Sequence, residues 1–175
     1  TPFVIVYGHK PMYSSNSYHG SEVELRDSLE EMYVAQGVDL VIAGHDHFYE
    51  RTWPVSAEAV MDTGNDDRFS RGEGPIHLVI GIAGRSAYEE LDEPQPEWSA
   101  YRENNSYGWT RLVYDGDVRE LTLTHHRIDG TIGDQFTIQE STSIVESDDS
   151  SALGHIGMDS VFAIVALLGA ALRKR

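Results

Sequence analysis

Two short apolar runs, each followed by a Gly-His step, constrain this chain more than any other feature. The first run occupies residues 2–8 and leads to His9, and the second occupies residues 38–43 and leads to Gly44-His45-Asp46-His47. Continuous apolar runs of this length are typical of buried strands. The sequence therefore predicts two core strands that each present imidazole side chains where they end.

A helix is predicted between these strands. Ser21 and Glu24 have the spacing of a capping box, apolar side chains recur at near-helical spacing after them, and Gly37 stands where a C-terminal cap is expected. Strand, loop, helix and strand in this order favour parallel pairing, with functional sites at the carboxyl ends of the strands. Both Gly-His steps fall at those ends.

The histidines indicate a metal site. Neutral imidazole is a common ligand of zinc, iron and manganese. Gly44 permits an unusual backbone angle that turns the strand out sharply, so that His45 and His47 can reach two metal ions about 3.5–4 Å apart. His9 can complete the nitrogen ligands of one ion. A metal-dependent hydrolase is the first hypothesis, because clustered ligands imply a site.

Composition limits the function classes. The net charge of -16 argues against nucleic acid as a partner, since no basic stripe could neutralise phosphates. The chain has no cysteine, which excludes disulfides, cysteine zinc sites and a thiol nucleophile. An anionic substrate would have to be attracted by local charge such as that of a metal. Asn104-Asn105-Ser106 is a glycosylation sequon, relevant to a secreted protein.

The second half of the chain is predicted to be mainly antiparallel β. A third apolar strand covers residues 76–84, after a loop-like stretch at 56–74. A long aromatic connection follows at 85–108. Asp-Gly turn signals then separate three further strands. These strands are predicted at residues 109–115, 118–126 and 134–139.

The last segment differs in character from the rest. Residues 140–155 read as an acidic polar linker and residues 156–175 as an apolar tail that ends in Arg173-Lys174-Arg175. Two interpretations of the tail remain open: a C-terminal membrane anchor with its basic end in the cytoplasm, or a terminal amphipathic helix. The chain begins with Thr1 and enters a core strand at once, so we expect it to be the C-terminal portion of a longer protein.

The motifs carry a family resemblance. Val6-Tyr7-Gly8-His9 and Gly44-His45-Asp46-His47 match the last two of five metal-binding blocks in the purple acid phosphatases of the metallophosphoesterase superfamily. The resemblance continues at Gly74–Gly84 and at Ser106–Leu112, and it ends near Phe136. Residues 1–139 therefore resemble the C-terminal part of that catalytic domain, whose fold is a four-layer α/β/β/α sandwich.

The resemblance implies an activity and roles for single residues. His9 and His45 correspond to ligands of a divalent ion (Fe, Zn or Mn), and His47 to a ligand of Fe(III). His19, in the loop after Val-x-x-His, corresponds to a histidine that contacts the substrate phosphate and protonates the leaving group. The implied activity is acid phosphatase: a metal-activated hydroxide at a binuclear centre hydrolyses a small phosphomonoester. We expect a secreted or extracytoplasmic location, with C-terminal anchoring as the alternative described for the tail.

One departure from the family matters. The family's first three blocks supply aspartates, a tyrosine and an asparagine upstream of Val-x-x-His, and this chain has no later stretch that replaces them. Iron needs such oxygen ligands beside the imidazoles. Two alternatives to an acid phosphatase therefore stand: a phosphodiesterase or nucleotide pyrophosphatase on the same fold, or a catalytically incomplete metal-binding fragment.

Other polar residues receive structural interpretations. Asp46 is expected to face solvent or to cap its turn. Glu50 and Arg51 are expected to pair with each other behind the site. His77 is predicted to be packed in the core, and His125 and His126 to lie on the surface of an edge strand.

Overall fold

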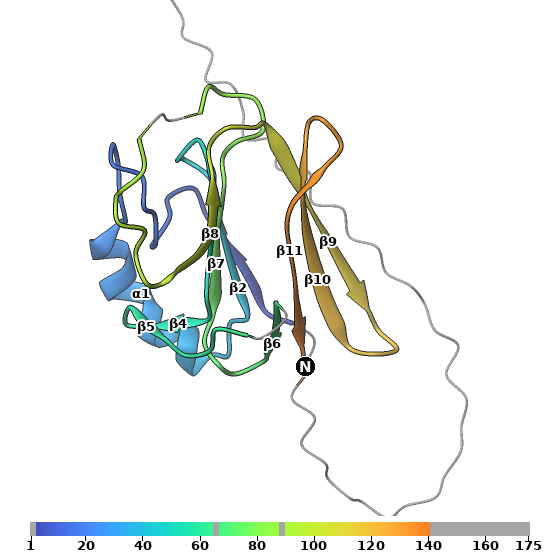
Figure 1. Ribbon diagram of the computed structural model, residues 1–175. Coiled ribbons are helices and arrows are strands. Elements are labelled where there is room, and N and C mark those ends of the chain that lie inside the picture. Colours follow the sequence, from blue (N-terminus) through green and yellow to red (C-terminus); the bar gives the residue numbers. More distant parts are fainter. Residues whose placement is uncertain (1–2, 65–66, 88–89, 141–175) are drawn as a thin grey trace, which may run out of the picture.

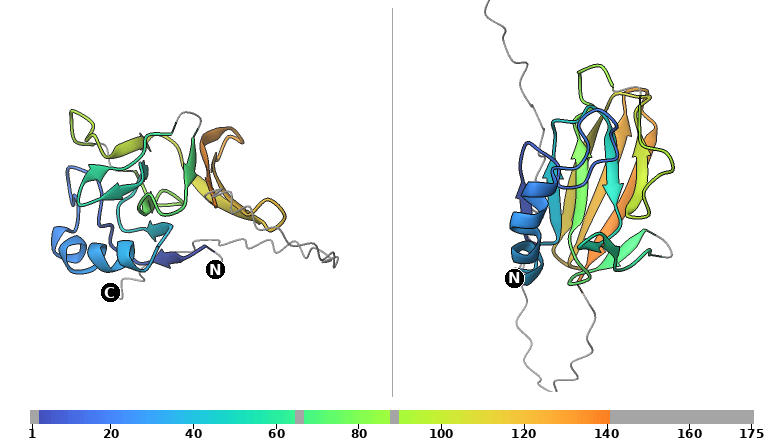
Figure 2. Two further views of the ribbon diagram at one scale, coloured as in Figure 1. Left: turned by 90° about the horizontal axis from the view of Figure 1, so that it is seen from below. Right: turned by 90° about the vertical axis from the view of Figure 1, so that its left-hand side faces the viewer.

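A computed structural model describes residues 3–64, 67–87 and 90–140 (Figure 1). Two β-sheets face each other, and one helix lies on the far side of the first sheet from the second (Figures 1 and 2). The described residues therefore form α, β and β layers, in the order expected for part of a four-layer sandwich.

The first sheet carries both Gly-His steps. The strands lie side by side in the order β1-β2-β7-β3-β8, with the bounds given below. β1, β2 and β7 pair in parallel, and β3 pairs antiparallel with both β7 and β8, so that β3 alone of the five runs in the opposite direction. Ile5 pairs with Leu40 and Tyr7 with Ile42, which confirms the predicted parallel pairing. The strands are β1 (Ile5–Tyr7), β2 (Leu40–Ala43), β3 (Tyr49–Thr52), β7 (Ile76–Ile80) and β8 (Ser99–Glu103).

The predicted helix is present as α1 (Val23–Ala35), but its start differs from the capping-box prediction. Glu22 precedes the helix without a side-chain cap, and the hydroxyl of Ser21 instead bonds the backbone of Ser14, accepting from its amide at 3.0 Å. Gly37 takes a positive φ of 64° just after the helix, as predicted for its C-terminal end. Ser21 therefore organises the preceding loop rather than the helix.

The second sheet follows the predicted turns. Its antiparallel strands β9 (Gly108–Asp115), β10 (Glu120–Arg127) and β11 (Ile132–Gln139) are joined in sequence, and β6 (Arg68–Ser70) pairs in parallel with β11. A small hairpin of β4 (Val55–Ser56) and β5 (Ala59–Val60) stands apart from both sheets. Short strands thus occupy the stretches predicted as loops at 56–74 and 85–108.

The hydrophobic core lies between the two sheets. Alternate side chains of the facing strands fill it and remove their apolar surface from water, which is the main force that holds the layers together. The buried members are Leu40, Ile42, Tyr49, Phe69, Ile76, Leu78, Ile82, Leu112, Leu121, Leu123, Phe136 and Ile138.

Buried polar groups cross the same interface. Arg51 donates to Asp134 at 2.7 and 3.0 Å, and Tyr49 donates to the same carboxylate at 2.8 Å. His125 stacks on Tyr49 at 4.0 Å between ring centroids, with Glu103 at 3.2 Å from its Nε2. Because a buried charge is tolerated only when it is paired, these contacts fix how the sheets align.

Two structural interpretations of the sequence were wrong here. His125 is 1% exposed, because β10 lies between β9 and β11 rather than at an edge. Glu50 and Arg51 point to opposite faces of β3 and do not pair: Arg51 binds Asp134, whereas Glu50 accepts hydrogen bonds from serines on the other side. The prediction for His77 is confirmed, since it is 4% exposed in the core.

The predicted tail lies outside the residues that the structure describes. Apart from Glu140, the predicted linker at 140–155 and the predicted apolar tail at 156–175 fall among residues that the structure does not describe. In the part of the chain that is described, no helix has the length and apolar character needed to span a membrane.

Candidate metal centre

The ends of two parallel strands bring His9 and His45 together. The Nε2 of His9 lies 3.1 Å from the Nδ1 of His45, and the ring centroids are 4.9 Å apart. Backbone hydrogen bonds join the two turns: the amide of Gly8 donates to Ile42 at 2.9 Å, and the amide of Gly44 donates to His9 at 3.1 Å. The predicted meeting of the two Gly-His steps is therefore present in the fold.

The unusual backbone angle that was expected at Gly44 is adopted instead by the next residue, His45. His45 takes φ 64°, a left-handed conformation that L-residues seldom adopt and that clusters at functional sites. Gly81, at the end of the third parallel strand, makes room for this turn: a β-carbon there would lie 2.0 Å from the carbonyl oxygen of Asp46. Sequence reasoning passed over Gly81, although a glycine directly after a buried strand is a known signal of close backbone approach.

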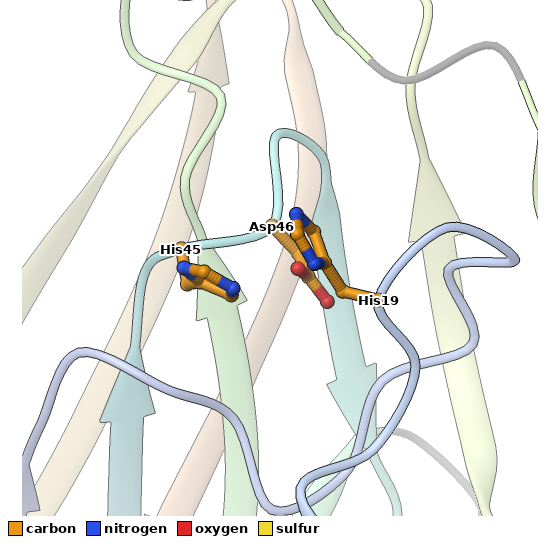
Figure 3. Close-up of side chains that lie close together, drawn as sticks. All are labelled: His19, His45 and Asp46. Carbon is orange, nitrogen blue, oxygen red and sulfur yellow. The ribbon is translucent and has the colours of Figure 1, made fainter.

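The loop after β1 contributes a third imidazole. His19 lies with its ring centroid 4.4 Å from that of His45. Figure 3 shows His45 and Asp46 on the turn after β2, with His19 reaching toward them from the loop. One ligand atom from each of these residues lies within 4.8 Å of the others, which makes this the group in the described chain that could hold a metal ion.

Asp46 does not face solvent as expected. It is fully buried, and its Oδ2 accepts a hydrogen bond from the hydroxyl of Ser14. Its other oxygen has no hydrogen-bond partner among the described residues. Burial raises the pKa of Asp46, and the Ser14 hydrogen bond opposes that rise. Asp46 thus places a buried carboxylate within 4.8 Å of ligand nitrogens of His19 and His45.

The electrostatics of the turn favour neutral imidazoles. Burial is the largest cause that lowers the pKa of His45, and the charge of His19 lowers it further. Burial also lowers the pKa of His47, against a hydrogen bond with the backbone of Ser86 that raises it. A metal binds the neutral ring, so both shifts favour the ligating form. Of the three predicted metal ligands, His9 and His47 lie outside the group formed by His19, His45 and Asp46, although His9 contacts His45.

The loop that carries His19 is fixed by buried side chains. The Oδ1 of Asn16 accepts the amides of Tyr18 at 3.0 Å and of His19 at 3.1 Å, and Asn16 is 1% exposed. Next to it, Ser15 donates through its amide and its hydroxyl to Glu50, at 2.8 and 2.6 Å. No periodic pattern or motif in the sequence points to these roles, because they depend on contacts across the fold.

The donor set fits one side of a binuclear centre. It offers imidazole nitrogens that lie close enough to share a site, together with a carboxylate oxygen of Asp46. Nitrogen donors of this kind suit zinc, iron and manganese.

Comparison with known proteins assigns the family. Residues 1–49 match the family model described as calcineurin-like phosphoesterase, and residues 74–135 match iron/zinc purple acid phosphatase-like protein C. The chain belongs to the purple acid phosphatases. This confirms the resemblance seen in the motifs, and the description of the second model supports a metal centre of the iron/zinc type.

Two curated purple acid phosphatase relatives illustrate the match. Acid phosphatase type 7 of Danio rerio is 31% identical over 168 residues, which cover 86% of this chain and 36% of that protein. "Probable inactive purple acid phosphatase 9" of Arabidopsis thaliana is 33% identical over 181 residues, which cover 94% of this chain and 26% of that protein. The chain thus spans about a third or less of the length of these relatives.

A solved structure supports the fold. Purple acid phosphatase PPD1 from yellow lupin (Lupinus luteus) seeds superposes with a TM-score of 0.73 at 25% identity, over 87% of this chain and 28% of that one. The chain therefore has the metallophosphoesterase fold predicted for residues 1–139.

Proposed function

We propose that this chain provides the histidine side of the binuclear metal centre of an acid phosphatase that hydrolyses phosphomonoesters. The observation that carries the proposal is the 3.1 Å approach of the His9 and His45 ring nitrogens at the ends of neighbouring parallel strands. The names of the relatives, acid phosphatases from animals and fungi among them, support the same reaction.

The residues divide between two ions. His9 and His45 would hold the divalent ion (Fe, Zn or Mn), and His47 would hold Fe(III). Such a centre supplies Lewis-acid stabilisation of the phosphoryl oxygens and a nucleophile at working pH. Asp46, buried on the same turn and hydrogen-bonded to Ser14, would fix the turn that carries His45 and His47 and would place a carboxylate beside them.

His19 would act as the general acid. It is exposed, and its amide is fixed by Asn16 at 3.1 Å, so the imidazole is presented to solvent from an anchored backbone. A protonated imidazole can donate to the oxygen of the departing alkoxide, and histidine is the side chain that most often fills this role. His19 would thus hold a proton at the point where the leaving group separates.

The expected setting follows from charge and sequence. The substrate would be a small phosphorylated molecule rather than nucleic acid, because the net charge of -16 repels a polyanion. We place the protein in a secreted or extracytoplasmic location, which the Asn104-Asn105-Ser106 sequon suits. Membrane attachment through residues 156–175 stays a proposal.

A metal-binding comparison of single variants tests the proposal. Purified chain, dialysed with zinc, iron or manganese, is analysed for bound metal by mass spectrometry. His45→Ala should lower retention of the divalent ion at least tenfold, since it removes one of its two imidazole ligands. His126→Ala is the matched control, because His126 lies on β10 in the other sheet, and it should retain metal like the unchanged chain. Equal retention by the two variants would mean that the site is misplaced.

Hydrolysis then separates the possible activities. In the protein with its complete centre, 4-nitrophenyl phosphate should be cleaved faster than bis(4-nitrophenyl) phosphate, and His45→Ala should abolish turnover. Preference for the diester would favour the phosphodiesterase alternative. Metal binding without cleavage of either compound would favour the metal-binding fragment.

A further inference from the structure

Two arginines differ from the other cations in the described part of this acidic protein. Nearly every cation in the described part of the chain pairs with a carboxylate, whereas Arg85 and Arg111 have no hydrogen bond or ion pair there. Both are exposed. The paired cations are Lys10, Arg26, Arg51, Arg68, Arg71, Arg102, Arg119 and Arg127.

Arg85 lies on the loop that packs against the histidine turn. The loop begins at Gly81, whose α-carbon sits so close to the Asp46 carbonyl that a β-carbon would meet it at 2.0 Å. It continues to Ser86, whose backbone hydrogen bonds with His47. Arg85 is therefore carried between two points at which the loop contacts the turn after β2.

An exposed guanidinium at this place has a specific chemical use. Its planar fork of donors matches the two oxygens of a carboxylate or a phosphate. Most other arginines in the described residues already form an ion pair with an aspartate or a glutamate. The net charge of -16 also repels anions, so a cation beside the histidines would offset that repulsion where the substrate enters.

We propose that Arg85 recognises a second oxyanion of the substrate, a carboxylate or a further phosphate that accompanies the phosphate held at the histidines. The inference rests on the proposed function and narrows its substrate class to phosphomonoesters that carry another negative group. Arg85 is thus a specificity-determining residue that contacts the part of the substrate that does not react.

Binding of unreactive phosphonates tests this role without relying on turnover. The zinc-loaded chain is titrated by calorimetry with methylphosphonate, which has one oxyanion, and with phosphonoacetate and methylenediphosphonate, which add a carboxylate or a second phosphonate. The unchanged chain should bind the last two more tightly. Arg85→Gln should reduce that preference by about fivefold while its affinity for methylphosphonate stays the same. The preference should also weaken at high salt, because the contact is exposed.

Arg111→Gln is the matched control, since it removes the second arginine that is unpaired among the described residues, from strand β9 of the second sheet. It should leave all three affinities unchanged. An unaltered preference in Arg85→Gln, or an equal loss in Arg111→Gln, would overturn the inference and leave the proposed function standing. If the unchanged chain bound none of the phosphonates, both proposals would fail. Tighter binding of only phosphonoacetate, or of only methylenediphosphonate, would identify the oxyanion that Arg85 binds as a carboxylate or a phosphate.

Discussion

Gly81 lies directly against Asp46, so that a β-carbon at position 81 would be 2.0 Å from the Asp46 carbonyl oxygen. No side chain larger than hydrogen fits there unless the backbone moves, because the contact is with backbone atoms on both sides. The end of the third parallel strand thus sets the position of the turn that carries His45 and His47. A site built from loops gains its precision from this kind of contact with a strand.

Gly81→Ala should displace the histidine turn. We expect the free energy of unfolding to fall by about 1–3 kcal/mol, as for other substitutions that force a packed backbone apart, and zinc affinity to fall with it. Chemical denaturation and a zinc titration measure the two effects. Gly84→Ala is the control from the same loop, because nothing lies within 4 Å of a β-carbon there. Similar losses in both variants would show that the loop, rather than the Gly81 contact, is sensitive.

Asn16→Ala should loosen the backbone that presents His19. The variant removes the oxygen that accepts the Tyr18 and His19 amides, so we expect faster hydrogen exchange at both amides and a loss of about 1 kcal/mol in unfolding free energy. Amide exchange followed by NMR provides the measurement. Asn16→Asp keeps an acceptor oxygen and should retain most of the protection, whereas protection that survived in Asn16→Ala would contradict the assigned role.

The sequence predicted the parts of this fold that depend on local pattern. The parallel pairing of β1 with β2, the helix between them and the three-stranded meander all follow from apolar periodicity and turn residues. The meeting of His9 and His45 follows from the same pattern, since parallel strands end at one edge. The position of Gly37 at the C-terminal end of the helix was predicted for a similar reason, because its conformation depends on local sequence.

The rest depends on contacts between segments far apart in the chain. β3 reads Tyr-Glu-Arg-Thr and is fully buried, yet its polar residues gave no strand signal because their partners, such as Asp134 and Ser15, lie far away in sequence. His125 was misplaced because the order of strands in the second sheet is not visible in periodicity. The positive φ of His45 and the role of Asp46 likewise arise only when Gly81 and Ser14 are brought to the turn.

His77 should make the stability of the protein depend on pH. Burial lowers its pKa to about 3, and neither ring nitrogen has a hydrogen-bond partner in the described chain. Below its ordinary pKa of 6.5 the unfolded chain binds a proton that the folded chain does not, so stability falls as the pH drops from 6.5 toward 3. The expected contribution is a loss of about 2 kcal/mol between roughly pH 8 and pH 5.

Replacing the imidazole tests this account. His77→Phe keeps an aromatic ring beside Tyr13, whose centroid is 4.7 Å away, and removes the titrating group. Denaturant unfolding across the pH range should show a flatter profile, with stability at neutral pH unchanged or raised by about 1 kcal/mol. A profile as steep as that of the unchanged protein would assign the acid sensitivity to other groups.

The excess of negative charge should make the fold depend on salt. With 29 acidic residues against 13 basic ones, like charges repel one another across the folded surface more strongly than in the expanded unfolded chain. Raising sodium chloride from about 0.01 M to about 0.5 M shortens the Debye length several-fold, so we expect the free energy of unfolding at neutral pH to rise by about 1–2 kcal/mol. Urea titrations at each salt concentration measure the free energy of unfolding, because urea itself carries no charge.

Near the isoelectric point of about 4.7 the same salt step should have little effect, since the net charge has been lost. A salt response of equal size at both pH values would point to strengthened apolar burial instead.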